Sequence, residues 1–148
     1  YGLSGLRCGW IFAEPGIARR IWRLNDLYGN IPAHSAERLS LVALAQLDRL
    51  RERARAIVET NRALVQSFLS SRDDLESGLL PYGTTAFPRV RGDVTCLCDV
   101  LRHRYDTTVV PGRFFEQPDH VRIGMGGRTD ELREGLDRLG QALDDLRD

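Results

Sequence analysis

The sequence predicts an α/β protein, because short apolar runs typical of strands alternate with segments of helical periodicity, above all in the second half. The chain has 148 residues, 42% of them hydrophobic and 28% charged, which is enough for one or two small domains with real cores. Its 21 basic residues balance 21 acidic ones. We therefore expect neither a nucleic acid nor a membrane surface as the main partner.

The first half of the chain predicts a glycine-rich loop, a strand and long helices. An apolar run over 6–13 could form a buried strand, and apolar residues at three- and four-residue spacing predict a helix over 17–28. The run 28–32 contains glycine and proline and should end that helix. Ser35 is a suitable N-cap for a helical stretch reaching about residue 70, with a break expected near 46–49.

The second half predicts the order strand, helix, strand, strand, helix. Pro88 limits the first strand to the edge of a sheet or to a short length, because proline donates no ladder hydrogen bond. Thr129 is the expected cap of the last helix, which carries a stripe of leucines for the core. The predicted segments are a turn-rich connection at 75–82, strands at 83–90, 107–110 and 120–125, and helices at 92–105 and from 129 onward.

The most specific motif is the opening run 1–10, YGLSGLRCGW. It resembles the segment that follows the cofactor lysine in fold-type-I, class I/II aminotransferases, which depend on pyridoxal 5′-phosphate (PLP). The family pattern is aromatic-Gly-Leu-x-Gly-Leu-Arg-x-Gly-aromatic, and its arginine pairs with the cofactor phosphate. Arg7 matches that arginine. The family's lysine precedes this arginine by eight residues, so counting back from Arg7 places it two residues before Tyr1.

The chemistry of Arg7 suits the implied role. A guanidinium is planar, always charged, and presents a fork of donors matched to phosphate oxygens. Flanking glycines allow the backbone to approach a ligand closely. The alternative for Arg7 is an exposed strand residue without a ligand. All 21 basic residues are arginines, so no lysine side chain in this chain can form a Schiff base.

A second motif surrounds Arg122. The run 109–115, VVPGRFF, precedes the strand VRIG at 121–124. In the same family a Val-x-Pro-Gly-x-x-Phe segment precedes a strand whose arginine binds the substrate α-carboxylate, and Arg122 holds that position. Strand alternation places Arg122 on the face opposite its apolar neighbours. The alternative is a structural ion pair with Asp119, Asp130 or Glu131.

Phe87 is a further candidate for the substrate pocket. The run 83–88, GTTAFP, resembles the family's Gly-Gly-x-Phe strand at the edge of that pocket, although Thr84 replaces the second glycine. Phe87 is equally suited to be an ordinary core aromatic. Arg113 and Phe114 lie in the loop before Arg122, and we consider them as residues at the border of the same site.

The resemblance also implies a domain organisation and a fold. It implies the C-terminal part of the PLP-dependent transferase fold type I: residues 1–34 as a remnant of the large PLP-binding domain, 35–71 as helices linking the domains, and 72–148 as the small C-terminal α/β domain. This corresponds to less than half of a complete enzyme, and the opening of the chain inside a motif favours a fragment.

The implied function is part of an aminotransferase that moves an amino group between an amino acid and a 2-oxo acid, with PLP as cofactor. The family is normally a homodimer. Without its lysine this chain alone should be inactive. The alternatives are another fold-type-I PLP reaction, such as that of a decarboxylase, lyase or cyclase, and a non-catalytic truncated module.

Metal binding and export are not indicated by the sequence. Cys96 and Cys98 fall at i and i+2 of a predicted helix, where they point apart, and the three histidines are scattered. The odd count of three cysteines without a disulfide framework, together with the lack of a secretory signal, suggests a cytoplasmic protein. No run approaches the ~20 apolar residues of a membrane span.

Overall fold

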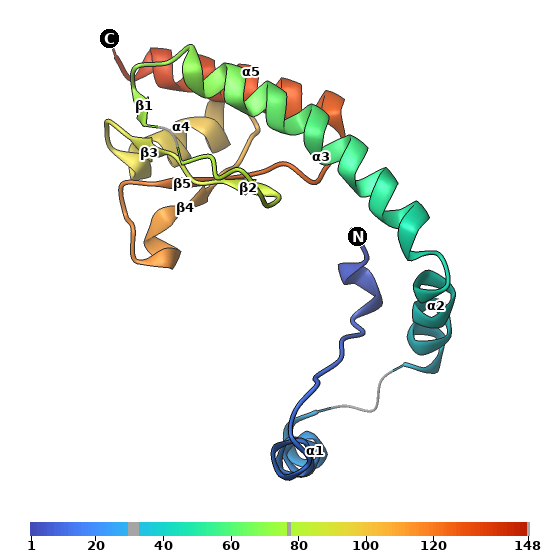
Figure 1. Cartoon of the computed structure of the whole chain (residues 1–148). Coiled ribbons are helices and arrows are strands. Elements are labelled where there is room, and N and C mark those ends of the chain that lie inside the picture. The colour runs from blue at the N-terminus through green and yellow to red at the C-terminus, as the bar shows by residue number, and fades with distance from the viewer. Residues whose placement is uncertain (30–32, 77, 148) are drawn as a thin grey trace. The chain divides into compact units, whose positions relative to one another are not determined.

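A computed structural model of the chain describes residues 1–29, 33–76 and 78–147 (Figure 1). The chain divides into two compact units, Tyr1–Glu52 and Arg53–Asp148. The boundary falls within one continuous helix, α3 (Leu47–Ser70). It also falls inside the segment 35–71 that the sequence marks as the link between domains. No helix in the described residues combines the length and the apolar character needed to cross a membrane.

The first unit is helical. It contains a short 3₁₀ helix, η1 (Ser4–Leu6), then α1 (Pro15–Tyr28), α2 (His34–Leu44) and the first turns of α3. Pro15 occupies the first turn of α1, where its missing N–H costs nothing and its fixed φ favours the helix. The helix predicted over 17–28 is thus confirmed. The turn predicted over 28–32 includes residues 30–32, which lie outside the described residues.

The strand predicted over 6–13 is wrong. Residues 7–14 have no regular structure, and no strand lies among the described residues of this unit. A strand exists only through ladder hydrogen bonds to a neighbour. An apolar run without such a neighbour therefore stays irregular, whatever its propensity.

The long helical stretch breaks where α2 ends at Leu44 and α3 begins at Leu47, close to the predicted break near 46–49. The predicted cap at Ser35 is wrong. The N–H groups of Ala36 and Glu37 both donate to the carbonyl of Ala33, so the helix begins before Ser35. The N-cap is Ala33, and no side chain caps this end.

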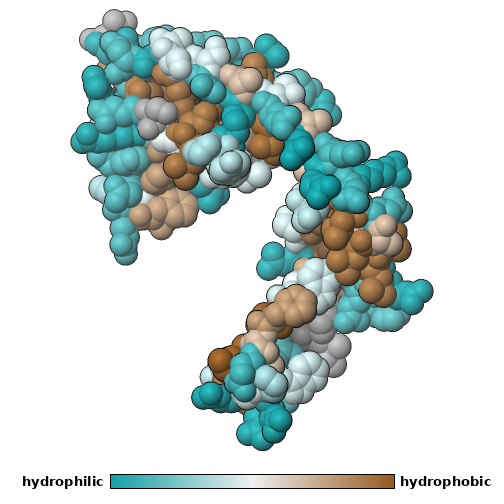
Figure 2. Space-filling model, viewed as in Figure 1, coloured by the Kyte–Doolittle hydropathy of each residue, from teal (hydrophilic) through white to brown (hydrophobic). Residues whose placement is uncertain are grey.

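Apolar side chains of the first unit remain largely exposed. No residue of α1 is buried, and Ser40 is the buried residue of α2. Figure 2 shows apolar surface gathered over α2, where Leu39, Leu41 and Val42 are all more than half exposed. Helices of this length depend on burying an apolar face. This unit does not bury its own apolar faces.

The second unit is the α/β part of the chain. One sheet pairs β1 (Leu75–Glu76) with β3 (Arg89–Val90), and the other has the order β2 (Thr85–Ala86), β5 (Val121–Gly124), β4 (Val110–Pro111). All pairs are antiparallel. The strand predicted at 83–90 appears as β2 and β3, separated at Phe87 and Pro88, and β2 is an edge strand as Pro88 predicts. The strand predicted at 120–125 is confirmed as β5.

Three helices cover the sheets of this unit: the end of α3, α4 (Val94–Arg104) and α5 (Thr129–Asp145). Figure 1 shows α3 and α5 lying side by side. The helix predicted over 92–105 is confirmed, and Asp93 caps it by accepting from the N–H groups of Thr95 and Cys96. The buried core includes Val65, Leu69, Leu97, Leu101, Val121, Ile123, Met125, Leu136, Leu139 and Leu143.

The leucine stripe predicted for the last helix is confirmed, but the predicted N-cap at Thr129 is wrong. Leu136, Leu139 and Leu143 are buried. Thr129 is the first helical residue, and the N-cap is Arg128 without a side-chain cap. Asp130 and Glu131 lie in the first turn of this helix, where the helix dipole favours negative charge.

Asn61 joins α3 to the segment that follows β5. Its side chain is fully buried, and its amide nitrogen donates to the carbonyls of Met125 at 2.9 Å and Gly127 at 3.0 Å. These two bonds satisfy backbone carbonyls of the segment that directly follows β5, the strand that contains Arg122. Its own side-chain oxygen, also buried, has no hydrogen-bond partner among the described residues.

A buried ion pair ties the end of α3 to β1 and α5. Arg72 donates to both carboxylate oxygens of Asp74, at 2.8 and 2.7 Å, and to Asp144 at 2.6 Å. The side chains of Arg72 and Asp74 are only 12% and 11% exposed. The hydrogen bonds from Arg72 hold the pKa of Asp74 below its usual 3.8, against the opposing effect of burial.

We predict that Asp74→Asn lowers the free energy of unfolding at pH 7 by about 1–3 kcal/mol, the range for a hydrogen bond to a charged group. Because the folded-state pKa is depressed, the ionised carboxylate stabilises the fold above pH 3.8, and this contribution is lost as the pH falls through the lower folded-state value. The difference between wild type and variant in urea unfolding should therefore shrink from pH 4 downward. A difference that stays constant to pH 2 would contradict this account.

Candidate active-site segments

Arg7 lies at the end of η1 in an unusual backbone conformation. Its φ is 50°, in the left-handed region, and its N–H donates to the carbonyl of Ser4 at 3.1 Å. A non-glycine residue there is uncommon, and such strain is concentrated at functional positions. The Arg7 side chain is exposed and makes no ion pair with any described residue. It is therefore a free cation, and it does not lie in a strand.

Arg122 lies on β5, the central strand of the three-stranded sheet. Its Cα partner is Val110 on β4, while Ile123 faces Ala86 on β2. Val121 and Ile123 point into the core, and Arg122 is exposed on the opposite face, as alternation predicts. The sheet thus holds the backbone of Arg122 from both sides and leaves the guanidinium outside the core.

The structure does not contain the ion pair that would give Arg122 a structural role. Asp119 instead binds Arg89 at 2.6 Å and His120 at 2.7 Å. Asp130 and Glu131 both pair with Arg128. Within the described part of the chain, Arg122 forms no ion pair and no hydrogen bond through its side chain. The three carboxylates considered as its partners bind other side chains, and Arg122 remains available for an anion.

The guanidinium of Arg122 makes a cation–π contact with the ring of Phe115, 5.2 Å from the ring centroid. Phe115 meets Phe87 edge to face at 5.6 Å, and Phe87 stacks on His120 at 4.9 Å. We call Phe87, Phe115 and His120 the aromatic cluster. Phe87, which is half-buried, is neither a core residue nor isolated. It lies beside the ring that contacts Arg122, and its contact with substrate stays a prediction.

Sequence reasoning missed Phe115 and His120 as neighbours of Arg122. For Phe115 a signal existed, because it is the phenylalanine of the Val-x-Pro-Gly-x-x-Phe pattern. For His120 none existed, since stacking on Phe87 joins residues far apart in the chain. Arg113 and Phe114, considered at the border of the site, form a separate pair in which the guanidinium lies 4.9 Å from the ring centroid. Among the described residues, neither makes a ring contact, hydrogen bond or ion pair with Arg122 or the aromatic cluster, so we do not include them in the site.

The loop that presents Phe115 depends on Gly112. A Cβ atom at this position would lie 2.0 Å from the carbonyl oxygen of Gln117 and 2.7 Å from that of His120. The N–H of Gly112 donates to that same His120 carbonyl at 2.7 Å, so the backbones cannot separate without losing the bond. A short 3₁₀ helix, η2 (Gly112–Phe115), follows directly.

We predict that Gly112→Ala destabilises the protein by about 1–3 kcal/mol, because a methyl group would overlap two backbone oxygens. Thermal unfolding of the variant measures this loss. Gly126→Ala is the matched control, since a Cβ there meets nothing within 4 Å. Equal melting temperatures for the two variants would show that the loop 112–120 is not packed as described.

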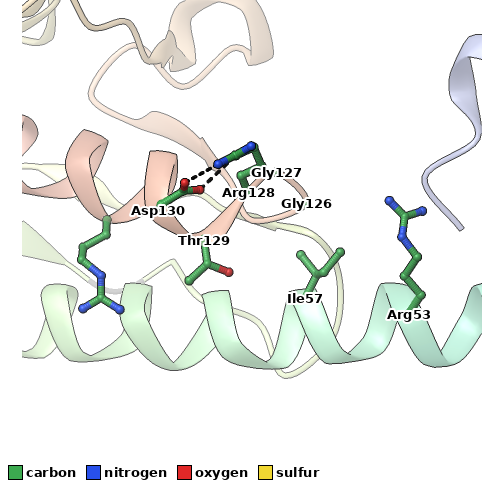
Figure 3. A pocket seen from close by; sticks show the side chains of 8 residues that line it. Arg53, Ile57, Gly126, Gly127, Arg128, Thr129 and Asp130 are labelled. Atoms are coloured by element: carbon green, nitrogen blue, oxygen red, sulfur yellow. Dashed lines mark hydrogen bonds and ion pairs between the residues drawn. The ribbon is translucent and has the colours of Figure 1, made fainter.

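A large cavity of the second unit lies elsewhere. About 770 Å³ in volume, it is lined by Arg53, Ile57, Gly126, Gly127, Arg128, Thr129, Asp130 and Arg133. Figure 3 shows Arg128 turned toward Asp130, the two side chains joined by hydrogen bonds. The hydrogen bonds from Arg128 lower the pKa of Asp130 to about 2. A carboxylate therefore already occupies the start of α5, and we do not assign this cavity to substrate or cofactor.

No group of three or more metal-ligating side chains lies together in the described residues. Cys8, Cys96 and Cys98 are all free thiols. Burial raises the pKa of Cys98 above its usual value, which keeps this thiol protonated at neutral pH. The candidate chemistry therefore rests on Arg7 and Arg122.

Comparison with known proteins places these segments in a family. Residues 1–139 match the family model "Aminotransferase class I and II". The chain is 34% identical over 146 residues to capreomycidine synthase of Streptomyces vinaceus, covering 97% of this chain and 38% of that protein. It is 24% identical over 152 residues to aspartate aminotransferase of Thermotoga maritima, covering 97% of this chain and 37% of that protein.

Comparison with solved structures indicates the same family. A PLP-dependent aminotransferase from Streptococcus suis superposes with a TM-score of 0.88 at 25% identity, over 99% of this chain and 40% of that one. A PLP-dependent cyclase, OrfR, superposes with a TM-score of 0.85 at 28% identity, over 97% of this chain and 40% of that one. The chain thus spans about two fifths of the length of the relatives it matches. It belongs to the class I and II aminotransferase family, has part of the fold-type-I architecture, and the cofactor of that family is pyridoxal 5′-phosphate.

Proposed function

We propose that this chain is the C-terminal portion of a PLP-dependent aminotransferase that transfers an amino group between an amino acid and a 2-oxo acid. The family match supports the reaction class. The observation that carries the proposal is the state of Arg122. It is held on a central strand and forms no ion pair with a described residue, and the carboxylates of Asp119, Asp130 and Glu131 bind other side chains. A bidentate guanidinium left open in this way suits the α-carboxylate of an amino acid.

The two arginines would have separate tasks. Arg7, a free cation on a strained turn, fits the phosphate of PLP. Arg122 would bind the substrate carboxylate and so fix the orientation of the Cα–H bond. When bound, PLP supplies the electron sink for chemistry at Cα. The chain has no lysine, so the proton-transferring lysine would belong to the rest of the protein, two residues before Tyr1 on the family pattern.

The rest of the enzyme would also cover the apolar faces of α1 and α2. Those faces are exposed in this chain, and the relatives are much longer than it is. We further propose that the complete enzyme is a cytoplasmic homodimer, as the family resemblance and the free cysteines suggest.

A second candidate is a cyclisation reaction within the same fold. It is favoured by two comparisons, the 34% identity to capreomycidine synthase and the likeness to a PLP-dependent cyclase. Fold alone does not decide between the reactions. Product analysis of the full-length enzyme separates them: a transaminase converts an amino acid only when a 2-oxo acid is added, whereas a cyclase forms its product without one.

We predict that no side chain of the 148-residue chain forms a Schiff base with PLP, because the chain contains no lysine. Addition of PLP to the purified chain, with its α-amino group acetylated, should produce no new visible absorption band beyond that of the free cofactor, and borohydride should fix no cofactor mass to the protein. A stable adduct on any side chain would contradict the prediction. The full-length enzyme, treated identically, is the positive control.

A further inference from the structure

The Arg122 side chain contacts an aromatic ring and no acidic partner. β5 has four residues, and the guanidinium projects from it without an ion pair or side-chain hydrogen bond among the described residues. A free arginine side chain has rotamer entropy that a ligand must overcome on binding. A neighbouring carboxylate would order the side chain but would also occupy its donors. The ring of Phe115 orders it without that cost.

Contact with an aromatic face leaves the N–H groups of a guanidinium free. The attraction comes from the ring quadrupole and needs no acceptor atom. The Arg122 guanidinium lies 5.2 Å from the centroid of Phe115 and donates no side-chain hydrogen bond to a described residue. Its five N–H donors therefore remain available to a carboxylate.

Phe115 can serve as a support because it is itself held in place. Phe87 meets it at an interplanar angle of 88° and stacks on His120 in turn. The ring of His120 is fixed through Nδ1, 2.7 Å from Asp119, which also binds Arg89. On the backbone side, Gly112 closes the loop tightly. Both the ring and its loop therefore have few alternative positions.

We propose that Phe115 is a positioning residue for substrate binding: supported by Phe87 and His120, it holds the Arg122 guanidinium in its carboxylate-binding orientation. This rests on the proposed function, in which Arg122 binds the substrate carboxylate. Phe115 acts through Arg122 and need not touch the substrate.

The same loop contains a matched control. Arg113 lies over Phe114 at 4.9 Å, which repeats the contact of Arg122 with Phe115. Phe114, however, is 67% exposed, against 43% for Phe115, and makes no ring-to-ring contact within the described residues. Replacing Phe114 removes an equivalent ring from an arginine that is not supported by the aromatic cluster.

The experiment compares Phe115→Leu and Phe114→Leu in the full-length holoenzyme. Phe115→Leu should raise KM for the amino acid about 5- to 30-fold with little change in kcat, as expected when ground-state and transition-state binding weaken together. Phe114→Leu should leave both constants within about twofold, and Phe115→Tyr, which keeps the ring, should restore a low KM. Phe115→Met keeps the volume without the ring and replaces Phe115→Leu if that variant does not fold.

Two readouts separate positioning from a structural effect. Phe115→Leu should not weaken binding of the corresponding amine that lacks the carboxylate, and it should add nothing in an Arg122→Ala background. Equal effects of Phe115→Leu and Phe114→Leu, or equal weakening of amine and amino acid, would overturn the proposal while leaving the role of Arg122 intact. If Arg122→Ala itself left KM unchanged, the proposed function of Arg122 would fail, and this proposal with it.

Discussion

Arg122→Ala in the full-length enzyme is expected to lower kcat/KM for its amino acid substrate about 100- to 1,000-fold. The substitution removes both arms of a charged hydrogen-bonded pair and leaves the substrate carboxylate unpaired in the site, a loss on the order of 3–4 kcal/mol. Arg122→Lys keeps the charge but not the two-pronged donor geometry, so its decrease in kcat/KM should be about tenfold smaller than that of Arg122→Ala. Steady-state kinetics across a range of amino acid concentrations measures both.

Arg102→Ala is the control for this prediction, because Arg102 is an exposed arginine on α4. Its kinetic constants should match those of wild type. A second comparison uses an amine without a carboxylate, which should bind equally well to wild type and Arg122→Ala. A variant Arg122→Ala with wild-type kinetics toward amino acids would exclude the carboxylate role.

Asn61→Asp should cost about 3–5 kcal/mol of unfolding free energy. In the native fold, the buried Asn61 amide donates to the carbonyls of Met125 and Gly127. An ionised aspartate would place a buried negative charge against two carbonyl oxygens, and a protonated one would have a single donor for two acceptors. Asn61→Leu leaves both carbonyls unsatisfied without a charge and should cost less, about 2–3 kcal/mol. Urea unfolding at pH 7 measures both losses.

Gln66→Glu is the matched control, since it makes the same amide-to-carboxylate change on the exposed side of α3. Its effect should stay within about 0.5 kcal/mol. The Asn61→Asp penalty should also decrease at low pH, where the carboxyl group is neutral. A penalty for Asn61→Asp no larger than that of Gln66→Glu would mean that Asn61 is not buried at this junction.

Elements with strong local signals were predictable. The apolar spacing over 17–28, the helix predicted over 92–105 and the leucine stripe of the last helix each depend on residues within a few turns of one another. The alternation around Arg122 is equally local, and it correctly placed that side chain on the face opposite the core.

The predictions that failed depended on partners distant in the sequence or on the exact residue at which a helix begins. The run 6–13 has strand propensity but no neighbour to pair with among the described residues of this unit. Ser35 and Thr129 are good caps by residue type, but both lie inside their helices, whose N-caps are Ala33 and Arg128. The aromatic cluster joins Phe87 to residues 115 and 120 through tertiary packing, which no local pattern encodes.

The most direct test of the central claim is to locate the cofactor in the full-length enzyme. Borohydride reduction of the holoenzyme fixes PLP to the residue that holds it, and peptide mass spectrometry then identifies that residue. The account predicts a lysine two residues before Tyr1, on the peptide that ends at Arg7. Cofactor fixed at a lysine elsewhere, or none fixed at all, would contradict the assignment of Arg7 to the phosphate and of this chain to a catalytic PLP enzyme.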